Sequence, residues 1–395
     1  WSSDVCSSDL GFRRPRMEGI LSELQGALEI LFCNAPGDQN AAIQWIQQFA
    51  GSDHAIEACL RLMESVDRNR NAILFGVLKI LVQRFLLGWT TISHEQMEVV
   101  MNAVMGLCVS NGDLPQHVID SVVDLSSVIV ILYQEMEISM LENIYSLCES
   151  GKLGTAIYIQ LCGTIPLIAK RMPHYFTSIA QATFDAKWRR IRDFTFHSIE
   201  RITSSVSLSE LLHYPPVFEG LCRQLSNWYL FSYNDAIALP GDESFFEESC
   251  DDSAISTKNI RIPFESLSSL PLFQTLMEAT HSIIGNFDRS PTELADLLTA
   301  SLSLLGDLLA FPSPSLPQLR QRCDAGAAHL ALLRQLAETL LETPKLDFSS
   351  PAVISLPAGV ADSLARLVSD HLPAVTSVGL LPRLLDSLVR LLHTT

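Results

Sequence analysis

Motifs that resemble enzyme signatures occur at two places in the sequence, and each departs from its signature at a decisive position. The sequence HEQME at residues 94–98 begins like the zinc-protease motif HExxH, but its fifth position is Glu98, so one turn of helix presents a single imidazole. The sequence SGKLGT at residues 150–155 resembles the end of a phosphate-binding loop, but Ser146 replaces the first glycine and Leu153 replaces the metal-binding Ser or Thr. There is no GxGxxG or GxSxG motif either. We therefore expect no enzyme activity, no cofactor and no metal site.

Two charged clusters are candidates for contacts with other proteins. The basic cluster surrounds Trp188 and consists of Lys187, Arg189, Arg190 and Arg192. It could dock an acidic partner, stack on a base or close onto an acidic loop of the same chain, and an ordinary exposed helix face is the simpler alternative. The acidic cluster is an insert at residues 235–259 that includes Asp251 and Asp252. Adjacent carboxylates can do acid–base chemistry in principle, but in a loop of this composition they are normally only solvated.

The composition favours a large buried core and argues against nucleic-acid binding as the main activity. Of the 395 residues, 48% are hydrophobic and 18% are charged, and the net charge of −17 has the wrong sign for neutralising phosphates. The nine cysteines are scattered and form no CxxC motif, so we expect buried free thiols in a reducing compartment, with disulfides as the alternative. The most apolar stretch, residues 72–89, carries Lys79 and Arg84, which predicts a buried helix with one polar seam and no membrane insertion.

Hydrophobic periodicity predicts the elements that position these residues. Apolar side chains recur every three or four positions, as in amphipathic helices, and no stretch alternates like a strand. Helices are expected at residues 17–33, 40–50, 52–66, 72–85, 93–108, 115–133 and 138–148. Ser52 is the expected N-cap of the third of these helices. A single bundle of this length would outgrow one core, so we predict an all-α fold: an α-solenoid (superhelix) of HEAT-like antiparallel helix pairs of about 40–47 residues each.

Interruptions of the helical pattern divide the chain. Residues 1–16 begin with WSSDVCSSDL, which resembles the translation of a sequencing-adapter oligonucleotide, and we expect them to be a non-native or disordered leader. Closely spaced prolines at residues 311–317 must end a helix, and residues 347–359 predict a further loop. We expect helical repeats at residues 17–110, 111–234 and 260–395, with the acidic loop at 235–259 between the second and third blocks and the third block truncated.

Residues 41–108 carry a more specific pattern. An A-x-x-W-I-x-x-F helix is followed by a short turn and by a helix that begins near an alanine, formed by Ala42, Trp45, Ile46, Phe49, Ser52 and Ala55. The next two helices contribute Phe75, Gly76, Lys79, Trp89 and Gln96. This arrangement resembles the N-terminal repeats of the importin-β superfamily of nuclear transport receptors (karyopherins), nearest to the exportin and transportin-3/importin-13 relatives. Beyond about residue 150 the resemblance is diffuse and rests on the helical pattern, the sequence LSNWYLFSY and the segment at Arg261–Pro263.

The resemblance implies a receptor that shuttles between nucleus and cytoplasm. Its first repeats would bind the GTP form of the small GTPase Ran, its concave surface a protein cargo, and its convex grooves the phenylalanine-glycine (FG) repeats of nucleoporins. The implied Ran-facing strip comprises Asn71, Phe75, Lys79 and Gln83, with Phe75 alternatively in the core. Further candidate partner contacts are Lys187, Arg189 and Arg190 in the basic cluster and Asp251 and Asp252 in the acidic loop. The alternative function is a cytosolic HEAT- or armadillo-type scaffold that assembles a protein complex without binding a GTPase.

Overall fold

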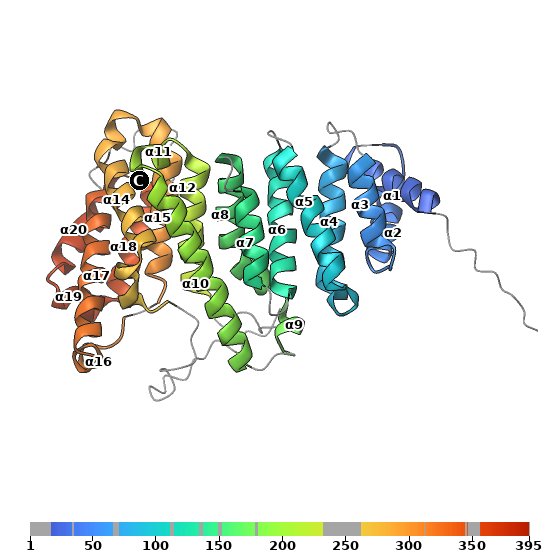
Figure 1. Ribbon diagram of the computed structural model, residues 1–395. Coiled ribbons are helices and arrows are strands. Elements are labelled where there is room, and N and C mark those ends of the chain that lie inside the picture. Colours follow the sequence, from blue (N-terminus) through green and yellow to red (C-terminus); the bar gives the residue numbers. More distant parts are fainter. Residues whose placement is uncertain are drawn as a thin grey trace, which may run out of the picture. The chain divides into compact units, whose positions relative to one another are not determined.

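Helices form every regular element in the described part of the chain, which confirms the all-α prediction (Figure 1). The computed structural model describes residues 17–33, 35–65, 71–110, 114–133, 137–148, 152–177, 181–231, 262–311, 313–343, 346 and 356–394. The expected leader at residues 1–16 and the expected acidic loop at 235–259 lie outside these ranges. The chain divides into two compact units, residues 1–133 and residues 134–395.

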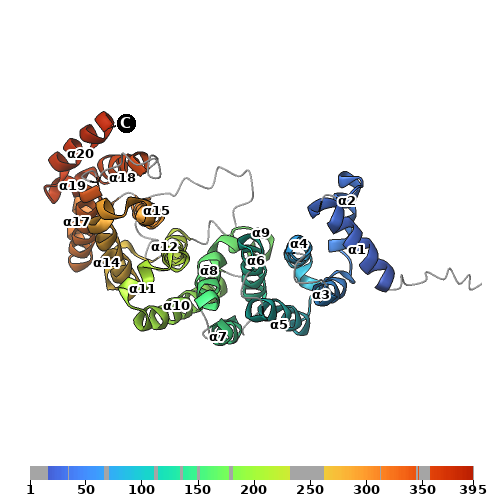
Figure 2. The ribbon, with the colours of Figure 1, turned by 90° about the horizontal axis from the view of Figure 1, so that it is seen from above.

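Unit 1 consists of helix pairs arranged in two layers. Its elements are α1 (Met17–Phe32), α2 (Gln39–Ala50), α3 (Ala55–Ser65), α4 (Asn71–Gly88), η1 (Trp89–Thr91), α5 (His94–Ser110) and α6 (Gln116–Leu132). The first helices of the pairs, α1, α3 and α5, pack side by side, and so do the second helices α2, α4 and α6 (Figure 2). Each first helix also packs on its own second helix, α1 on α2, α3 on α4 and α5 on α6. Every helix of this unit therefore buries a face against a neighbour within its layer and another against its pair.

Helix α4 is the central helix of unit 1. Its side chains Ile73, Val77, Leu81 and Phe85 are fully buried, and it packs on α1, α3 and α6. The segment Asn71–Thr91 is long and apolar enough to cross a membrane by length and composition, and 56% of its most apolar 18-residue window is buried within the protein. Such burial is typical of a core helix, because a lipid-facing helix would expose its apolar side chains.

Polar side chains define where several of these helices begin. The Asp38 carboxylate accepts hydrogen bonds from the backbone N–H groups of Asn40 and Ala41 at 2.9 and 3.2 Å, which caps α2. Ser93 and Gln96 form a reciprocal pair of hydrogen bonds, at 3.0 and 3.2 Å, just before α5. The HEQME motif is therefore a capped helix start. The prediction that Ser52 caps α3 is wrong: α3 begins at Ala55, and the Ser52 hydroxyl has no hydrogen-bond partner.

Unit 2 repeats the two-layer arrangement over a longer stretch. Its elements are α7 (Glu137–Cys148), α8 (Lys152–Ala169), α9 (Pro173–Thr177), α10 (Gln181–Ser205), α11 (Leu208–Leu212), α12 (Pro215–Leu230), η4 (Phe264–Ser269), α14 (Pro271–Asn286), η5 (Phe287–Arg289), α15 (Pro291–Leu308), α16 (Leu316–Gln321), α17 (Asp324–Glu342), α18 (Leu356–Asp370), α19 (Leu372–Ser377) and α20 (Leu381–Thr394). One layer is the row α8, α12, α15 and α18, in which each helix packs on the next (Figure 2). Helices α7, α10, α14 and α17 form the second layer, which covers one side of that row.

The contact between α8 and α12 depends on a proline inside α8. Pro166 has no N–H group, so the carbonyl oxygen of Cys162 one turn earlier loses its helical hydrogen bond. The indole Nε1–H of Trp228 donates to that carbonyl oxygen at 2.9 Å, and Asn227 Nδ2 donates to the neighbouring carbonyl of Gly163 at 2.7 Å. A Cβ atom on Gly163 would lie 3.1 Å from the Gln224 backbone, so this glycine permits the close approach of the two helices.

A cluster of aromatic rings fills the core between α9, α10 and α12. Trp188 is fully buried and lies 4.9 Å from Phe231, 5.6 Å from Phe184 and 5.8 Å from Trp228, measured between ring centroids. The prediction that Trp188 is the aromatic element of a docking surface is therefore wrong. A large indole at a core-facing position buries more apolar area than any of its neighbours along α10.

The predicted boundaries agree with the structure only in part. Helix α15 ends at Leu308, ahead of the prolines at 311–317, as expected. The predicted division after residue 110 falls between α5 and α6, which pack together in unit 1, and the compact units meet after residue 133 instead. The loop prediction at 347–359 is wrong over its last residues, because α18 begins at Leu356 with Pro357 in its first turn.

Candidate functional site

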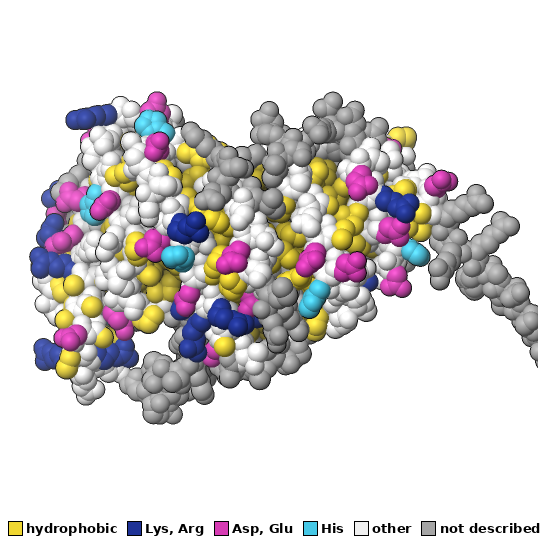
Figure 3. Space-filling model, in the orientation of Figure 1, with side chains coloured by type: hydrophobic (Ala, Val, Ile, Leu, Met, Phe, Trp, Pro, Cys, Tyr) yellow, Lys and Arg dark blue, Asp and Glu magenta, His cyan; other side chains and the backbone are white. Residues whose placement is uncertain are grey.

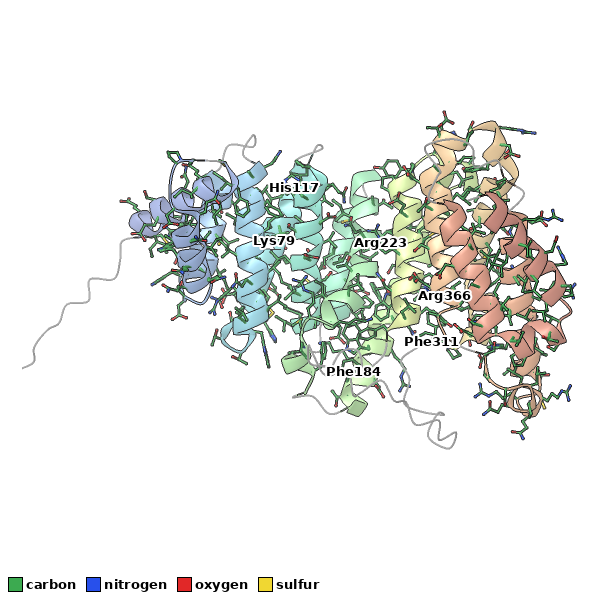
Figure 4. All side chains as sticks on the ribbon, turned by 180° about the vertical axis from the view of Figure 1, so that it is seen from behind. Lys79, His117, Phe184, Arg223, Phe311 and Arg366 are labelled. Carbon is green, nitrogen blue, oxygen red and sulfur yellow. The ribbon has the colours of Figure 1, made fainter. Side chains whose placement is uncertain are left out.

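A strip of half-buried side chains runs along α4 where it meets α6 in unit 1. The four residues of the predicted Ran-facing strip, Asn71, Phe75, Lys79 and Gln83, share this face, as their spacing of four requires. We call this surface, together with His117, Asp120 and Asp124 of α6, the α4–α6 strip. Figure 4 labels Lys79 and His117 on it.

Lys79 is the central charge of the α4–α6 strip. Its Nζ lies 3.1 Å from Oδ2 of Asp124 and 5.6 Å from the centroid of the Phe75 ring, and its side chain remains 42% exposed. Phe75 in turn makes edge-on contacts with His117 and Phe32, at centroid distances of 5.4 and 5.5 Å. Lys79 is thus held in a defined position but is still open to solvent. A partner carboxylate could share the ammonium with Asp124 without moving the backbone.

A polar groove crosses α12, α15 and α18, three helices of one row of unit 2, and no residue of it is among those predicted from the sequence. Two adjoining cavities of about 330 and 290 Å³ lie between α12 and α15 and between α15 and α18. Both are lined by Thr299, Ser303 and Asp307 of α15, so this helix is their common wall. We call the two cavities together the α12–α15–α18 groove, and Figure 4 labels Arg223 and Arg366 at its two sides.

The charges of the α12–α15–α18 groove are arranged unevenly. Each arginine is paired within its own helix: Arg223 with Glu219 at 3.9 Å and Arg366 with Asp362 at 3.1 Å. Two carboxylates of α15 line the groove, Asp296 and Asp307. Asp307 accepts a hydrogen bond from the Ser226 hydroxyl, and neither carboxylate has an ion-pair partner among the described residues. The groove therefore presents negative charge that no described cation of this chain balances. That arrangement suits a ligand carrying Lys or Arg side chains.

Small side chains make the groove possible. Its floor includes Thr299, Ala300, Ser303 and Gly306, and a Cβ atom on Gly306 would lie 3.3 Å from Oγ of Ser363 on α18. The recurrence of small and acidic residues at positions 296, 299, 303 and 307 follows the helical period and is a sequence signal for this face. It was missed because the same helix reads first as Leu-rich core.

A third cavity, of about 220 Å³, lies between α7, α8 and α10 in unit 2. Its apolar lining includes Tyr145, Tyr158, Ile202 and Val206. Arg201 also lines this cavity, and the central carbon of its guanidinium lies 5.1 Å from the centroid of the Tyr145 ring. The size and the aromatic lining suit a single apolar or aromatic side chain of a partner.

The predicted basic cluster on α10 does not form one surface. Lys187 is 8% exposed, its Nζ lies 3.4 Å from the Tyr175 hydroxyl, and burial lowers the pKa of its ammonium to about 8. Arg190 reaches Oε1 of the buried Glu137 at 2.7 Å, so it ties α10 to the start of α7. Arg189 is exposed. On the face of unit 2 drawn in Figure 3, basic and acidic side chains are mixed. Lys187 is therefore wrong as a surface contact, because α10 turns it toward the protein interior.

The remaining candidates do not build a catalytic site from the described residues. Asp251 and Asp252 lie outside the described ranges. Within the described part of the chain, no group of three or more His, Cys, Asp or Glu side chains is placed to hold a metal ion. The surface features that the described residues form are the α4–α6 strip, the α12–α15–α18 groove and the cavity between α7 and α10.

Neither a known protein family nor a curated protein matches the sequence of this chain.

Proposed function

We propose that this chain is a nuclear transport receptor of the importin-β type, folded as an α-solenoid of HEAT-like helix pairs. The observation that carries the proposal is the serial packing of helix pairs within each unit. Successive first helices begin at Met17, Ala55, His94, Glu137 and Gln181, a spacing of about 40 residues that suits HEAT-type repeats. Stacked pairs of this kind provide long inner and outer surfaces for proteins, which is what a carrier needs.

The α4–α6 strip is the proposed contact for the GTP form of Ran. It lies on second helices of early repeats, and its charged centre, Lys79, is partly exposed and positioned by Asp124. A basic side chain that is already oriented loses little conformational entropy when it binds an acidic partner. The strip also carries the apolar ring of Phe75 beside the charge, so it offers both parts of a typical protein contact.

The α12–α15–α18 groove is the proposed site for protein cargo, and the cavity between α7 and α10 for a nucleoporin phenylalanine. The unbalanced carboxylates of the groove favour a cargo segment with Lys or Arg. The aromatic lining of the smaller cavity favours an FG repeat. Ran and cargo would be coupled because both bind one array of stacked helices, and localisation would alternate between nucleus and cytoplasm.

A binding experiment with Ran in its two nucleotide states tests this proposal. The full chain should bind immobilised Ran-GTP and bind Ran-GDP much more weakly. Lys79→Ala should weaken the Ran-GTP complex by about tenfold, since one oriented charge contact contributes on the order of 1.4 kcal/mol. Arg61→Ala is the matched control, because Arg61 is an exposed cation on α3 whose partner, Glu57, belongs to the same helix. Equal binding of both nucleotide forms, or none, with circular dichroism showing a folded helical chain, would rule out the receptor function.

The cargo site can be tested separately with a defined probe. A fluorescent peptide of eight alternating arginine and glycine residues should bind the full chain, and the double substitution Asp296→Asn with Asp307→Asn should weaken it about tenfold or more. The double substitution Asp288→Asn with Asp324→Asn, which neutralises two exposed carboxylates outside the groove, is the control for net charge. Peptide binding without Ran binding would identify a scaffold that assembles protein complexes and would exclude the transport receptor. Equal loss in the control would exclude the groove as the site.

A further inference from the structure

Two buried histidines and one serine form a continuous chain of hydrogen bonds in unit 2. The Ser313 hydroxyl, in the loop after α15, lies 2.9 Å from Nε2 of His329 in α17 and 2.8 Å from Nδ1 of His371 between α18 and α19. The second ring nitrogen of His371, Nε2, lies 3.2 Å from the carbonyl oxygen of Leu309. These contacts join the loop after α15, the second turn of α17 and the α18–α19 junction, which are remote from one another in the sequence.

The Leu309 carbonyl determines which atom is the donor and which the acceptor in each hydrogen bond of this series. A carbonyl oxygen only accepts, so Nε2 of His371 must carry a hydrogen, and Nδ1 of the neutral ring is then an acceptor. The Ser313 hydroxyl donates to that Nδ1. Its oxygen is therefore left to accept the Nε2–H of His329. Both neutral imidazoles are thus assigned as Nε2–H tautomers.

An added proton does not fit either ring well. On His371 the proton would occupy Nδ1, so two N–H groups would point at the Ser313 oxygen and the hydroxyl hydrogen would lose its acceptor. On His329 it would occupy Nδ1 and leave a positive charge in a ring that is 6% exposed and packed 4.6 Å from the Phe264 ring. If both rings were protonated, two like charges would share one hydroxyl group.

The surroundings of His329 further favour its neutral form, whereas those of His371 favour the neutral form only in part. Burial, the neighbouring His371 and Arg322 lower the pKa of His329 to about 4. Burial also lowers the pKa of His371, while its hydrogen bond to Leu309 and the carboxylate of Asp370 act in the opposite direction. The folded protein therefore keeps both rings neutral at pH 7.

We propose that Ser313, His329 and His371 form an acid-sensitive clasp, which holds α17 and the α18–α19 junction against the end of α15 and opens when the histidines take up protons. Free histidine has a pKa of about 6.5, so the opened segment binds protons that the closed clasp excludes. The stabilisation by the clasp is complete above that pH and is lost as the pH falls from about 6.5 toward 4. The clasp is independent of the proposed transport function.

Hydrogen exchange of the full chain, corrected for the intrinsic pH dependence of exchange, measures the clasp directly. From pH 7.5 to 5.5 the opening equilibrium of α18 and α19 should rise about tenfold if one histidine gains a proton on opening, and up to about 100-fold if both do. Helix α4, in the other unit, should not follow. A pH-independent opening of α18 and α19 would overturn the proposal.

Substitutions separate the clasp from general acid sensitivity. His329→Gln keeps a side-chain N–H donor but cannot titrate, so it should reduce the pH-dependent rise by about tenfold. His197→Gln, which replaces an exposed histidine on α10, should leave the rise unchanged. The tautomers can be read from ¹⁵N chemical shifts of histidine-labelled wild-type protein at pH 7.5, where both clasp residues should be neutral Nε2–H forms. An Nδ1–H tautomer or an imidazolium at either position, or equal pH dependence in wild type and His329→Gln, would contradict the clasp.

Discussion

Pro166 and Trp228 illustrate how one residue creates a requirement that another must satisfy. The proline leaves the Cys162 carbonyl without its helical donor, and the indole of a different helix supplies the missing hydrogen bond. Trp228→Phe should destabilise the α8–α12 contact by about 1–3 kcal/mol, because a buried carbonyl is left unsatisfied. In a Pro166→Ala background the loss should be smaller, since an alanine amide at position 166 can donate to the same oxygen.

A double-mutant cycle measured by hydrogen exchange of α8 and α12 checks this dependence. The two substitutions should be coupled by about 1 kcal/mol. Additive effects within about 0.5 kcal/mol would mean that the indole contributes by packing alone.

Lys187 and its neighbour Trp188 show what residue types alone cannot reveal. Four cations around an aromatic ring look like a docking surface in a one-dimensional sequence. In the folded helix these side chains point in different directions, and the ring with the largest apolar area faces the core and turns Lys187 inward with it. The burial of Trp188 is consistent with its size, but a ring that buries it, Phe231, lies directly after α12, far along the sequence, and has no local signal.

At the scale of elements, glycines decide which helices can touch. A Cβ atom on Gly326, near the start of α17, would lie 1.8 Å from the backbone oxygen of Leu319 in α16. Gly326→Ala should therefore destabilise the protein by about 2 kcal/mol or more, because a backbone atom cannot move aside as a side-chain tip can. Gly285→Ala in α14 meets nothing within 4 Å and should stabilise by up to about 1 kcal/mol through helix propensity.

Thermal unfolding of the two glycine variants compares these effects on one scale. The midpoint should fall for Gly326→Ala and stay or rise for Gly285→Ala. An equal fall of the unfolding midpoint in both variants would show that the loss of backbone flexibility, and not the close approach of α16, destabilises Gly326→Ala.

The helices themselves were largely predictable, whereas their neighbours were not. The predicted spans 17–33, 40–50, 93–108 and 138–148 agree with α1, α2, α5 and α7 to within two residues, because hydrophobic periodicity and caps are local properties. The α12–α15–α18 groove depends on three helices brought together by packing across a long stretch of sequence, so the small and acidic residues of α15 indicate a polar face but not the helices that line the groove with it. Asn71, Phe75, Lys79 and Gln83 share one face because they lie within a single helix, and their contact with a partner stays a prediction.

At the scale of the whole molecule, we expect each helix to be stabilised mainly by its immediate neighbours and not by the chain as a whole. In stacked helix pairs each element contacts mainly its neighbours, so a local defect propagates weakly. Phe85→Ala removes a fully buried ring from α4 and should destabilise unit 1 by about 3–5 kcal/mol. Hydrogen exchange should accelerate in α3, α4 and α6, while α15 and α18 of unit 2 keep their protection. Equal loss in both units would show that the chain unfolds as one cooperative body.

The shared wall of the α12–α15–α18 groove has a consequence for avidity. Because Thr299, Ser303 and Asp307 border both cavities, a single extended segment that fills one cavity places its next residues at the mouth of the other. The second contact is then an intramolecular event at a high effective concentration. Two contacts that are weak separately can together bind the segment tightly. Shortening the segment by a few residues would abolish most of that gain in affinity. The groove would therefore discriminate between bound segments by their length as well as by their charge.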